Sequence, residues 1–179
     1  MPTPPVFAKA VYTAARREGR PFDVARGDYL LVPDAARSPL YLIETGAAHA
    51  CIQVASGTQT LRLGYPGEML AALPGFYLGV PTPIGIQAIR RCAGYSIMLE
   101  QLRAAVAANP ALTAAYTQML EEFVCGHVAR ELDLLEPDPA RRYANLLARS
   151  PHVFQHIPMR YIASYLRMAP ETLSRLRKK

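Results

Sequence analysis

The pattern of apolar and polar positions changes twice along this chain. Residues 7–18 have helical spacing, and Gly19 and Pro21 end that helix. Between Phe22 and Leu99, short apolar runs alternate with turns rich in glycine and proline, which is typical of many short antiparallel strands. Beyond this region the spacing is helical again. The pattern predicts an α+β fold, with an antiparallel β-barrel or jelly roll followed by helices.

Six apolar runs mark the expected strands, and turn residues separate them. The runs are DYLLV, LYLIE, HACIQVA, TLRLG, GIQAI and GYSIML. The expected turns lie at 27–28, 33–34, 46, 56–57, 66–67, 74–75 and 81–83. Within VASGTQT, Ser56-Gly57 is expected to form the tip of a hairpin.

The segment 111–135 contains no internal proline and predicts one helix, roughly 37 Å long. Two apolar stripes run along it. The first comprises Leu112, Tyr116, Met119 and Phe123, and the second comprises Leu120, Val124, Val128 and Leu135. A helix of this length exceeds what one small barrel needs, so we expect one stripe to cover the barrel and one to contact a second subunit. We assign the dimer contact to the first stripe; a single wide core-facing surface is the alternative.

Three shorter helices are expected after the long one. Asp138 is placed to cap a helix that begins at Pro139 and ends at Ser150. Two further helices each have a proline suited to the first turn, at Pro158 and Pro170. Only about three residues join these two helices, which is the signature of a helix-turn-helix.

Charge is distributed unevenly between the two ends of the sequence. The formal net charge is +6, of which residues 141–179 carry +8 and the rest −2. A near-neutral body with a basic end favours contact of that end with a polyanion such as DNA. A solvated basic face that only maintains solubility is the alternative.

Composition narrows the remaining classes of function. No apolar stretch approaches the roughly 18 residues needed to span a bilayer, and the first ten residues make a poor secretory signal. Three unpatterned cysteines suggest a reducing compartment, so a cytoplasmic location is expected. A cupin-like metalloenzyme needs about three histidines and a carboxylate on the barrel, and the barrel has only His49. We therefore predict no enzyme, no metal site and no cofactor.

The order of barrel, long helix and helix-turn-helix resembles the Crp/Fnr family of bacterial transcription regulators. The segments YLIETGAAHACIQVASGTQTLRLGYPGEML and IPMRYIASYLRMAPETLSRLRKK carry the resemblance, which is strongest to short members without a full winged hairpin. It implies a cyclic-nucleotide-binding-like sensor domain at 1–109, a dimerisation helix at 110–136 and a DNA-binding domain at 137–179. It also implies a homodimer that reads a near-palindromic duplex site.

The resemblance places the DNA-reading positions on the second helix of the motif. They fall on Pro170, Glu171 and Arg175. Thr172 and Ser174 lie nearby and suit phosphate oxygens, and Arg177, Lys178 and Lys179 supply positive charge near the phosphate backbone. Glutamate suits the cytosine amino group, and arginine suits guanine O6 and N7. Three residues depart from the family: Arg167 replaces the frequent glycine of the turn, Ala169 replaces a hydroxyl cap, and Pro170 occupies the first reading position. Arg167 and Ala169 favour an alternative, which is a partner-binding adaptor with a non-functional motif.

The resemblance also locates a phosphate cassette in the barrel. Gly67-Glu68 matches its first part, where the glutamate takes a ribose hydroxyl. Ile84 and Gly85 stand where the family has an arginine and a small hydroxyl residue. Because the arginine pairs with the cyclic phosphate, we expect no standard cAMP binding. An unidentified small-molecule effector, or none, remains open.

Overall fold

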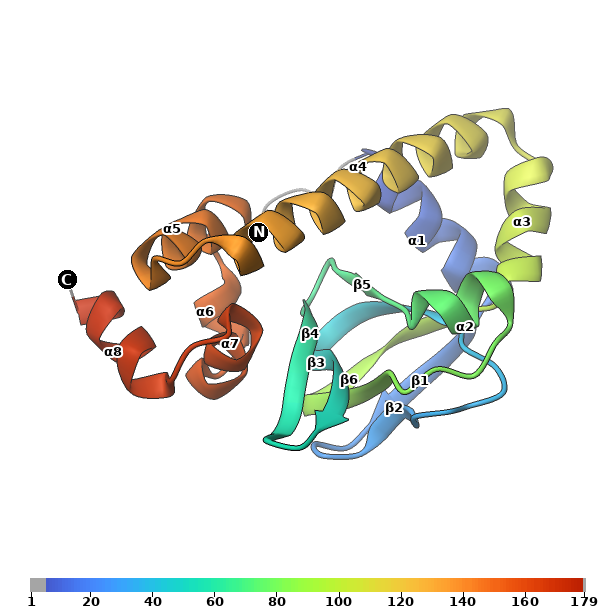
Figure 1. Ribbon diagram of the computed structural model, residues 1–179. Helices are drawn as coiled ribbons and strands as arrows, with labels where there is room; N and C mark the ends of the chain where they lie inside the picture. The colour runs from blue at the N-terminus through green and yellow to red at the C-terminus, as the bar shows by residue number, and fades with distance from the viewer. Residues whose placement is uncertain (1–5, 179) are drawn as a thin grey trace.

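The computed structural model describes residues 6–178, with side chains from residue 11 onward. An N-terminal helix leads into one antiparallel sheet, and further helices follow, beginning with a long one (Figure 1). The predicted α+β fold is confirmed.

The sheet has six strands in the order β1-β6-β3-β4, with β2 added to β6 and β5 added to β3. The strands are β1 (Arg20–Val24), β2 (Tyr29–Leu31), β3 (Leu40–Val54), β4 (Gly57–Gly64), β5 (Met69–Leu70) and β6 (Gly85–Ile97). The two long strands, β3 and β6, pair with each other from Leu40 to Cys51, with register shifts between Ile43 and Ala48. Such irregularities bend a strand, and the sheet curls accordingly in Figure 1.

Two of the predicted turns lie inside regular elements. Gly46 does not end a strand, because β3 runs through it with a φ of 79°. A Cβ at this position would lie 1.9 Å from the carbonyl oxygen of Arg91, so the glycine serves close approach to β6. Pro74-Gly75 lies within α2 (Leu73–Leu78). The predicted hairpin is confirmed, since Val54 pairs with Gly57 across its tip.

Three helices pack together beside the sheet: α1 (Val6–Glu18), α3 (Leu99–Ala107) and α4 (Pro110–Leu135). The long helix was predicted over 111–135 and begins one residue earlier. The Asn109 side chain caps it by accepting a hydrogen bond from the Ala111 N–H at 3.1 Å. The shared core of these helices and the sheet includes Val11, Leu42, Ile97, Leu102, Leu112 and Met119.

The structure does not divide the two apolar stripes of α4 as we assigned them. Leu120 of the second stripe is half-buried and packs against the same core as the first stripe. Leu112 and Met119 are each 6% exposed and pack into the core of their own chain, so they are not available to a second subunit. Tyr116 and Phe123 are half-buried. The outward-facing apolar residues are Val124, Val128, Leu132 and Leu135, each more than half exposed.

Four helices follow α4: α5 (Pro139–Arg149), α6 (Val153–His156), α7 (Met159–Leu166) and α8 (Pro170–Lys178). Asp138 caps α5 as predicted, accepting from the Ala140 N–H at 2.9 Å. The short α6 occupies a segment expected to be a loop. A small core forms between α7 and α8, with Ile162, Ala163, Leu166 and Leu173 buried and Leu176 half-buried.

The helix-turn-helix lies against the outer strand β4 (Figure 1). The Oγ of Ser164 accepts a hydrogen bond from the Thr60 N–H at 2.9 Å, and the Gln59 amide donates to the carbonyl oxygen of Ser164. Ala47 and Ile89 of the sheet share a core with the C-terminal helices. Sheet and helix-turn-helix are therefore packed together in this conformation.

Candidate nucleic-acid interface and effector cavity

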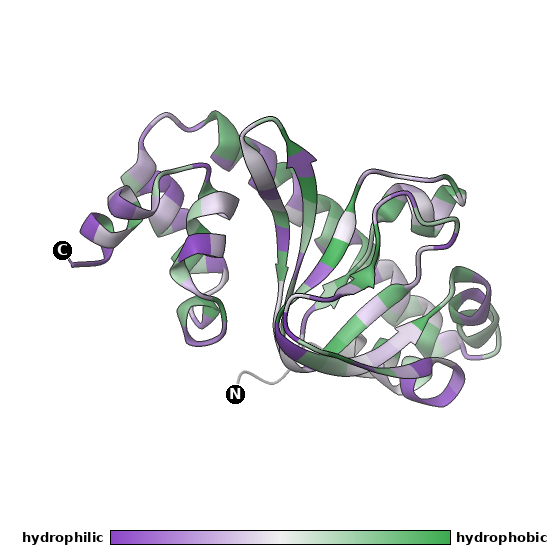
Figure 2. Cartoon of the chain, turned by 90° about the horizontal axis from the view of Figure 1, so that it is seen from below, coloured by the Kyte–Doolittle hydropathy of each residue, from purple (hydrophilic) through white to green (hydrophobic). Residues whose placement is uncertain are grey.

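The last helix presents a polar outer face. Leu173 is fully buried and fixes the rotation of α8 against α7. Glu171, Arg175 and Lys178 are exposed, and the half-buried Thr172 and Ser174 lie between them. Hydrophilic residues also gather at this end of the chain in Figure 2. The outer face of α8 thus offers a carboxylate, short hydroxyls and cations to a ligand.

Arg177 differs from the other basic side chains of this helix. Its guanidinium carbon lies 5.0 Å from the centre of the Phe154 ring, and its Nη1 donates to the Met159 sulfur at 3.7 Å. In this conformation Arg177 fastens α8 to α6 and α7. Lys179, also expected to meet DNA phosphates, lies outside the described residues.

Arg167 forms the turn between α7 and α8 with φ 54° and ψ 48°, the left-handed region. Its N–H donates to the carbonyl oxygens of Ala163 and Ser164, and the Met168 N–H bonds to Ala163 at 3.1 Å. Arg167 therefore adopts the left-handed conformation for which glycine is the usual residue. A non-glycine residue there costs about 1 kcal/mol.

A cavity of 480 Å³ lies between the sheet and α4. Its walls are mainly apolar, and they include Ala50, Leu61, Leu63, Met69, Leu70, Ala71, Leu73, Pro74, Phe123 and Leu134. Of the four cassette residues, Glu68 and Ile84 line the cavity, whereas Gly67 and Gly85 do not. A Cβ at Gly85 would meet the Tyr29 ring at 2.9 Å, so this position has no room for a hydroxyl side chain.

Four cationic or titratable side chains that the sequence reasoning missed also line this cavity: Arg62, His127, Arg130 and Arg167. Arg130 is 6% exposed. Its Nη2 donates to the Tyr165 carbonyl oxygen, and its guanidinium carbon lies 3.9 Å from the centre of the Tyr165 ring. Its Nη1 has no hydrogen-bond partner among the described residues, and neither does Nε2 of His127. The available signal was the helical spacing of Phe123, His127, Arg130 and Leu134, which places the arginine on one face of the helix with apolar residues.

Desolvation shifts the pKa values of several groups that line the cavity. It lowers the pKa of Arg130 and of His127, and for His127 the charge of Arg62 adds to the effect. Desolvation raises the pKa of the Glu68 carboxyl, and a hydrogen bond from Tyr65 partly offsets this rise. A cavity with a buried, unpartnered guanidinium N–H and an apolar lining is chemically suited to a ligand that combines an acceptor or anion with an apolar body.

No protein-family model and no curated protein matches this sequence. Solved structures do match its fold. FixK2 from Bradyrhizobium japonicum has a TM-score of 0.72 at 18% identity, covering 89% of this chain and 83% of that chain. The catabolite activator protein of Thermus thermophilus has a TM-score of 0.57 at 19% identity, covering 95% and 81%. CLP of Xanthomonas campestris, a c-di-GMP-responsive global regulator, has a TM-score of 0.65 at 14% identity, covering 95% and 90%.

These matches span most of each chain, so this protein has the fold of the Crp/Fnr regulators. By their descriptions, the Thermus protein is an activator and CLP is a regulator of virulence gene expression. Among residues 6–178, no three His, Cys, Asp or Glu side chains lie close enough together to hold a metal ion. No helix in the same range is long and apolar enough to cross a membrane.

Proposed function

We propose that this chain is a DNA-binding transcription regulator of the Crp/Fnr type. The observation that carries the proposal is the α7–α8 pair, in which Leu173 locks the second helix so that Glu171 and Arg175 stand on its free face. Arg175 is suited to guanine and Glu171 to cytosine. The excess of positive charge over residues 141–179 supports contact with a polyanion.

A homodimer is part of the proposal. The outer face of α4 carries Val124, Val128, Leu132 and Leu135, and contiguous exposed apolar residues favour a second copy of the same helix. A two-fold pair would present two α8 helices to successive major grooves, about 34 Å apart. The operator is then a near-palindrome.

The direct test is selection from a random duplex library, followed by binding at two salt concentrations. Arg175→Ala is expected to cost about 1–3 kcal/mol on the selected site and to relax preference at one base pair. Lys178→Ala serves as the comparison, since a phosphate contact should weaken binding to all sequences and reduce the salt slope by about one. Failure to enrich a palindrome, with equal losses for both variants, would favour the partner-binding adaptor.

The cavity between the sheet and α4 is the proposed effector site. Ile84 stands in place of the phosphate-pairing arginine, so cAMP is expected to bind weakly or not at all. Arg130 instead offers a free N–H to a ligand while its second nitrogen holds Tyr165 of α7. Ligand binding at Arg130 would thereby alter how firmly the helix-turn-helix is held.

Calorimetric titration with cAMP and c-di-GMP tests this site; the latter is included because the matched CLP is described as responsive to it. A micromolar affinity for cAMP would contradict the degenerate cassette. Ile84→Arg is expected to raise cAMP affinity, whereas a serine at Gly85 would collide with Tyr29. Loss of effector binding in Arg130→Met would support the role given to Arg130.

A further inference from the structure

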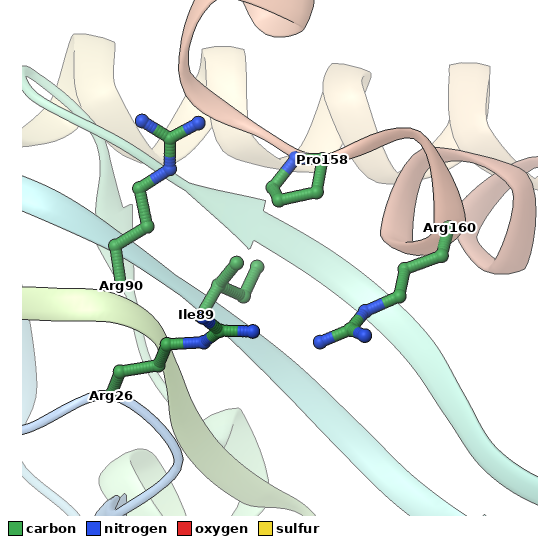
Figure 3. A pocket seen from close by; sticks show the side chains of 5 residues that line it. All are labelled: Arg26, Ile89, Arg90, Pro158 and Arg160. Carbon is green, nitrogen blue, oxygen red and sulfur yellow. The ribbon is translucent and has the colours of Figure 1, made fainter.

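A second cleft, of 490 Å³, lies between the sheet and the start of α7, away from the effector cavity (Figure 3). It is lined by Arg26 of the β1–β2 loop, Ile89 and Arg90 of β6, and Pro158 and Arg160 at the beginning of α7. In Figure 3, Arg26 and Arg160 extend towards each other across Ile89, and Arg90 rises beside Pro158. Three arginines, two from the sheet side and one from α7, therefore line the same cleft.

Both walls of this cleft are fixed by backbone contacts. The Gly27 N–H donates to the Ala88 carbonyl oxygen at 2.8 Å, and the Ala88 N–H donates to that of Asp28 at 2.9 Å. These bonds tie the loop that carries Arg26 to the strand that carries Arg90. On the other wall, the bond from Thr60 to Ser164 holds α7 in place. The arginines are presented by ordered backbone.

The cleft has a positive field that its own lining does not neutralise. None of its lining residues is an acid, and the ion pairs of the described chain use other arginines, such as Arg91 with Asp23 at 2.7 Å. The field also reaches neighbouring groups. Burial lowers the pKa of His156 and of His49, and Arg90 and Arg160, respectively, lower them further. Like charges converge here, and an anion would relieve their repulsion.

We propose that this cleft binds a phosphate-bearing small molecule with a flat ring, such as a nucleotide. Guanidinium groups match phosphate oxygens in bidentate geometry. The half-buried Pro158 provides the apolar surface on which a ring can lie, because Ile89 is only 2% exposed. The ligand joins Arg26 and Arg90 of the sheet to Arg160 of α7, and so it holds the helix-turn-helix against the sheet.

The test is calorimetry on the full chain without DNA, using pyrophosphate, ADP and adenosine as probes. ADP and pyrophosphate are expected to bind, ADP more tightly because its base adds the ring contact, and adenosine is expected not to bind. Arg90→Gln and Arg160→Gln should each weaken ADP binding by about tenfold or more. Arg91→Gln is the matched control, since Arg91 is the exposed neighbour that pairs with Asp23 outside the cleft.

Three outcomes would overturn the proposal. One is the absence of binding by both phosphorylated probes at millimolar concentration and low salt. Another is an equal loss in Arg91→Gln, which would mean that only the general positive field matters. The third is a lack of probe binding while Arg26→Gln and Arg90→Gln weaken duplex DNA binding, which would make the cleft a DNA backbone contact. Because the calorimetric measurement needs no DNA, its result tests the ligand site independently of the proposed regulator function.

Discussion

Arg167 is an unusual residue for the conformation that the turn requires. Its φ of 54° places it in the left-handed region, where a Cβ crowds the following carbonyl oxygen. The helix pair forms because the buried contacts of Leu166 and Leu173 outweigh a cost of about 1 kcal/mol. The departure at this position therefore acts on stability and does not prevent the fold.

Arg167→Gly is expected to raise the free energy of unfolding by about 1 kcal/mol, as measured by urea denaturation. Asp34→Gly is the matched control, because Asp34 has a similar φ of 57° and aspartate tolerates this region better. A gain at Asp34 as large as that at Arg167 would contradict the explanation.

His49 couples the sheet to α7 and makes stability depend on pH. The imidazole is 2% exposed, its Nδ1 lies 3.0 Å from the Thr60 hydroxyl, and its ring packs on the edge of Tyr161. Burial lowers its pKa below the ordinary 6.5, with a further contribution from Arg160, although Gln87 opposes the shift. The folded state therefore binds the His49 proton less readily than the unfolded state.

As the pH falls below 6.5, the unfolded chain takes up a proton at His49 that the folded chain does not, so the free energy of unfolding should decrease. His49→Gln should remove part of this decrease, as judged by urea denaturation at about pH 7.5 and about pH 5.5. His127 and His156, whose pKa values are also lowered, would retain the rest. Identical pH dependence in variant and parent would exclude the role of His49.

At the scale of the element, α4 has one face buried in the core and an opposite face exposed to solvent. Its inner stripe completes the core through Leu112 and Met119, and its C-terminal half leaves Val128 and Leu132 in contact with solvent. Exposed apolar residues at four-residue spacing on one helix favour helix–helix association. The proposed dimer contact therefore belongs to the outer stripe.

Val128→Asp should shift the protein to monomer in sedimentation velocity at micromolar concentration and weaken operator binding with it, because a charge would be buried in the helix–helix contact. Glu122→Lys, which changes charge on a different face of the same helix, should leave the dimer intact. A parent protein that sediments as a monomer would contradict the dimer itself.

At the scale of the whole molecule, the sensor sheet and the helix-turn-helix are coupled by few polar contacts. Ser164 accepts from Thr60 and from the Gln59 amide, and Tyr165 accepts from Arg130 of α4. These bonds connect the sheet, the effector cavity and α7. A change at either proposed ligand site would be transmitted through them.

Ser164→Ala leaves the N–H of the buried Thr60 without its acceptor, at a cost of about 1 kcal/mol. We expect faster amide hydrogen exchange throughout α7 and α8 and unchanged exchange in β3 and β6. Ser174→Ala, on the outer face of α8, is the control. Equally faster hydrogen exchange in all elements would indicate global destabilisation. It would contradict a local role of the Ser164–Thr60 hydrogen bond in holding α7 against the sheet.

The sequence by itself determined the features that depend on neighbours along the chain. The spacing of Ile162, Ala163, Leu166 and Leu173 specified the helix pair, because helical periodicity places such residues on one face. Asp138 and Pro139 marked the start of α5, because a helix N-terminus needs an acceptor for its free N–H groups. The alternation of apolar runs with turns identified the sheet for the same local reason.

Only the tertiary structure decided which residues meet across long separations in sequence. Gly46 appears as a turn in the sequence, and its role follows from the Arg91 backbone that packs on it. The inner and outer stripes of α4 are equally apolar, so only the packed core shows which one is buried. Arg62 and Arg130 converge on one cavity, and Arg26 and Arg160 converge on one cleft, because the fold brings distant elements together. Local periodicity does not specify which residues distant in sequence come into contact.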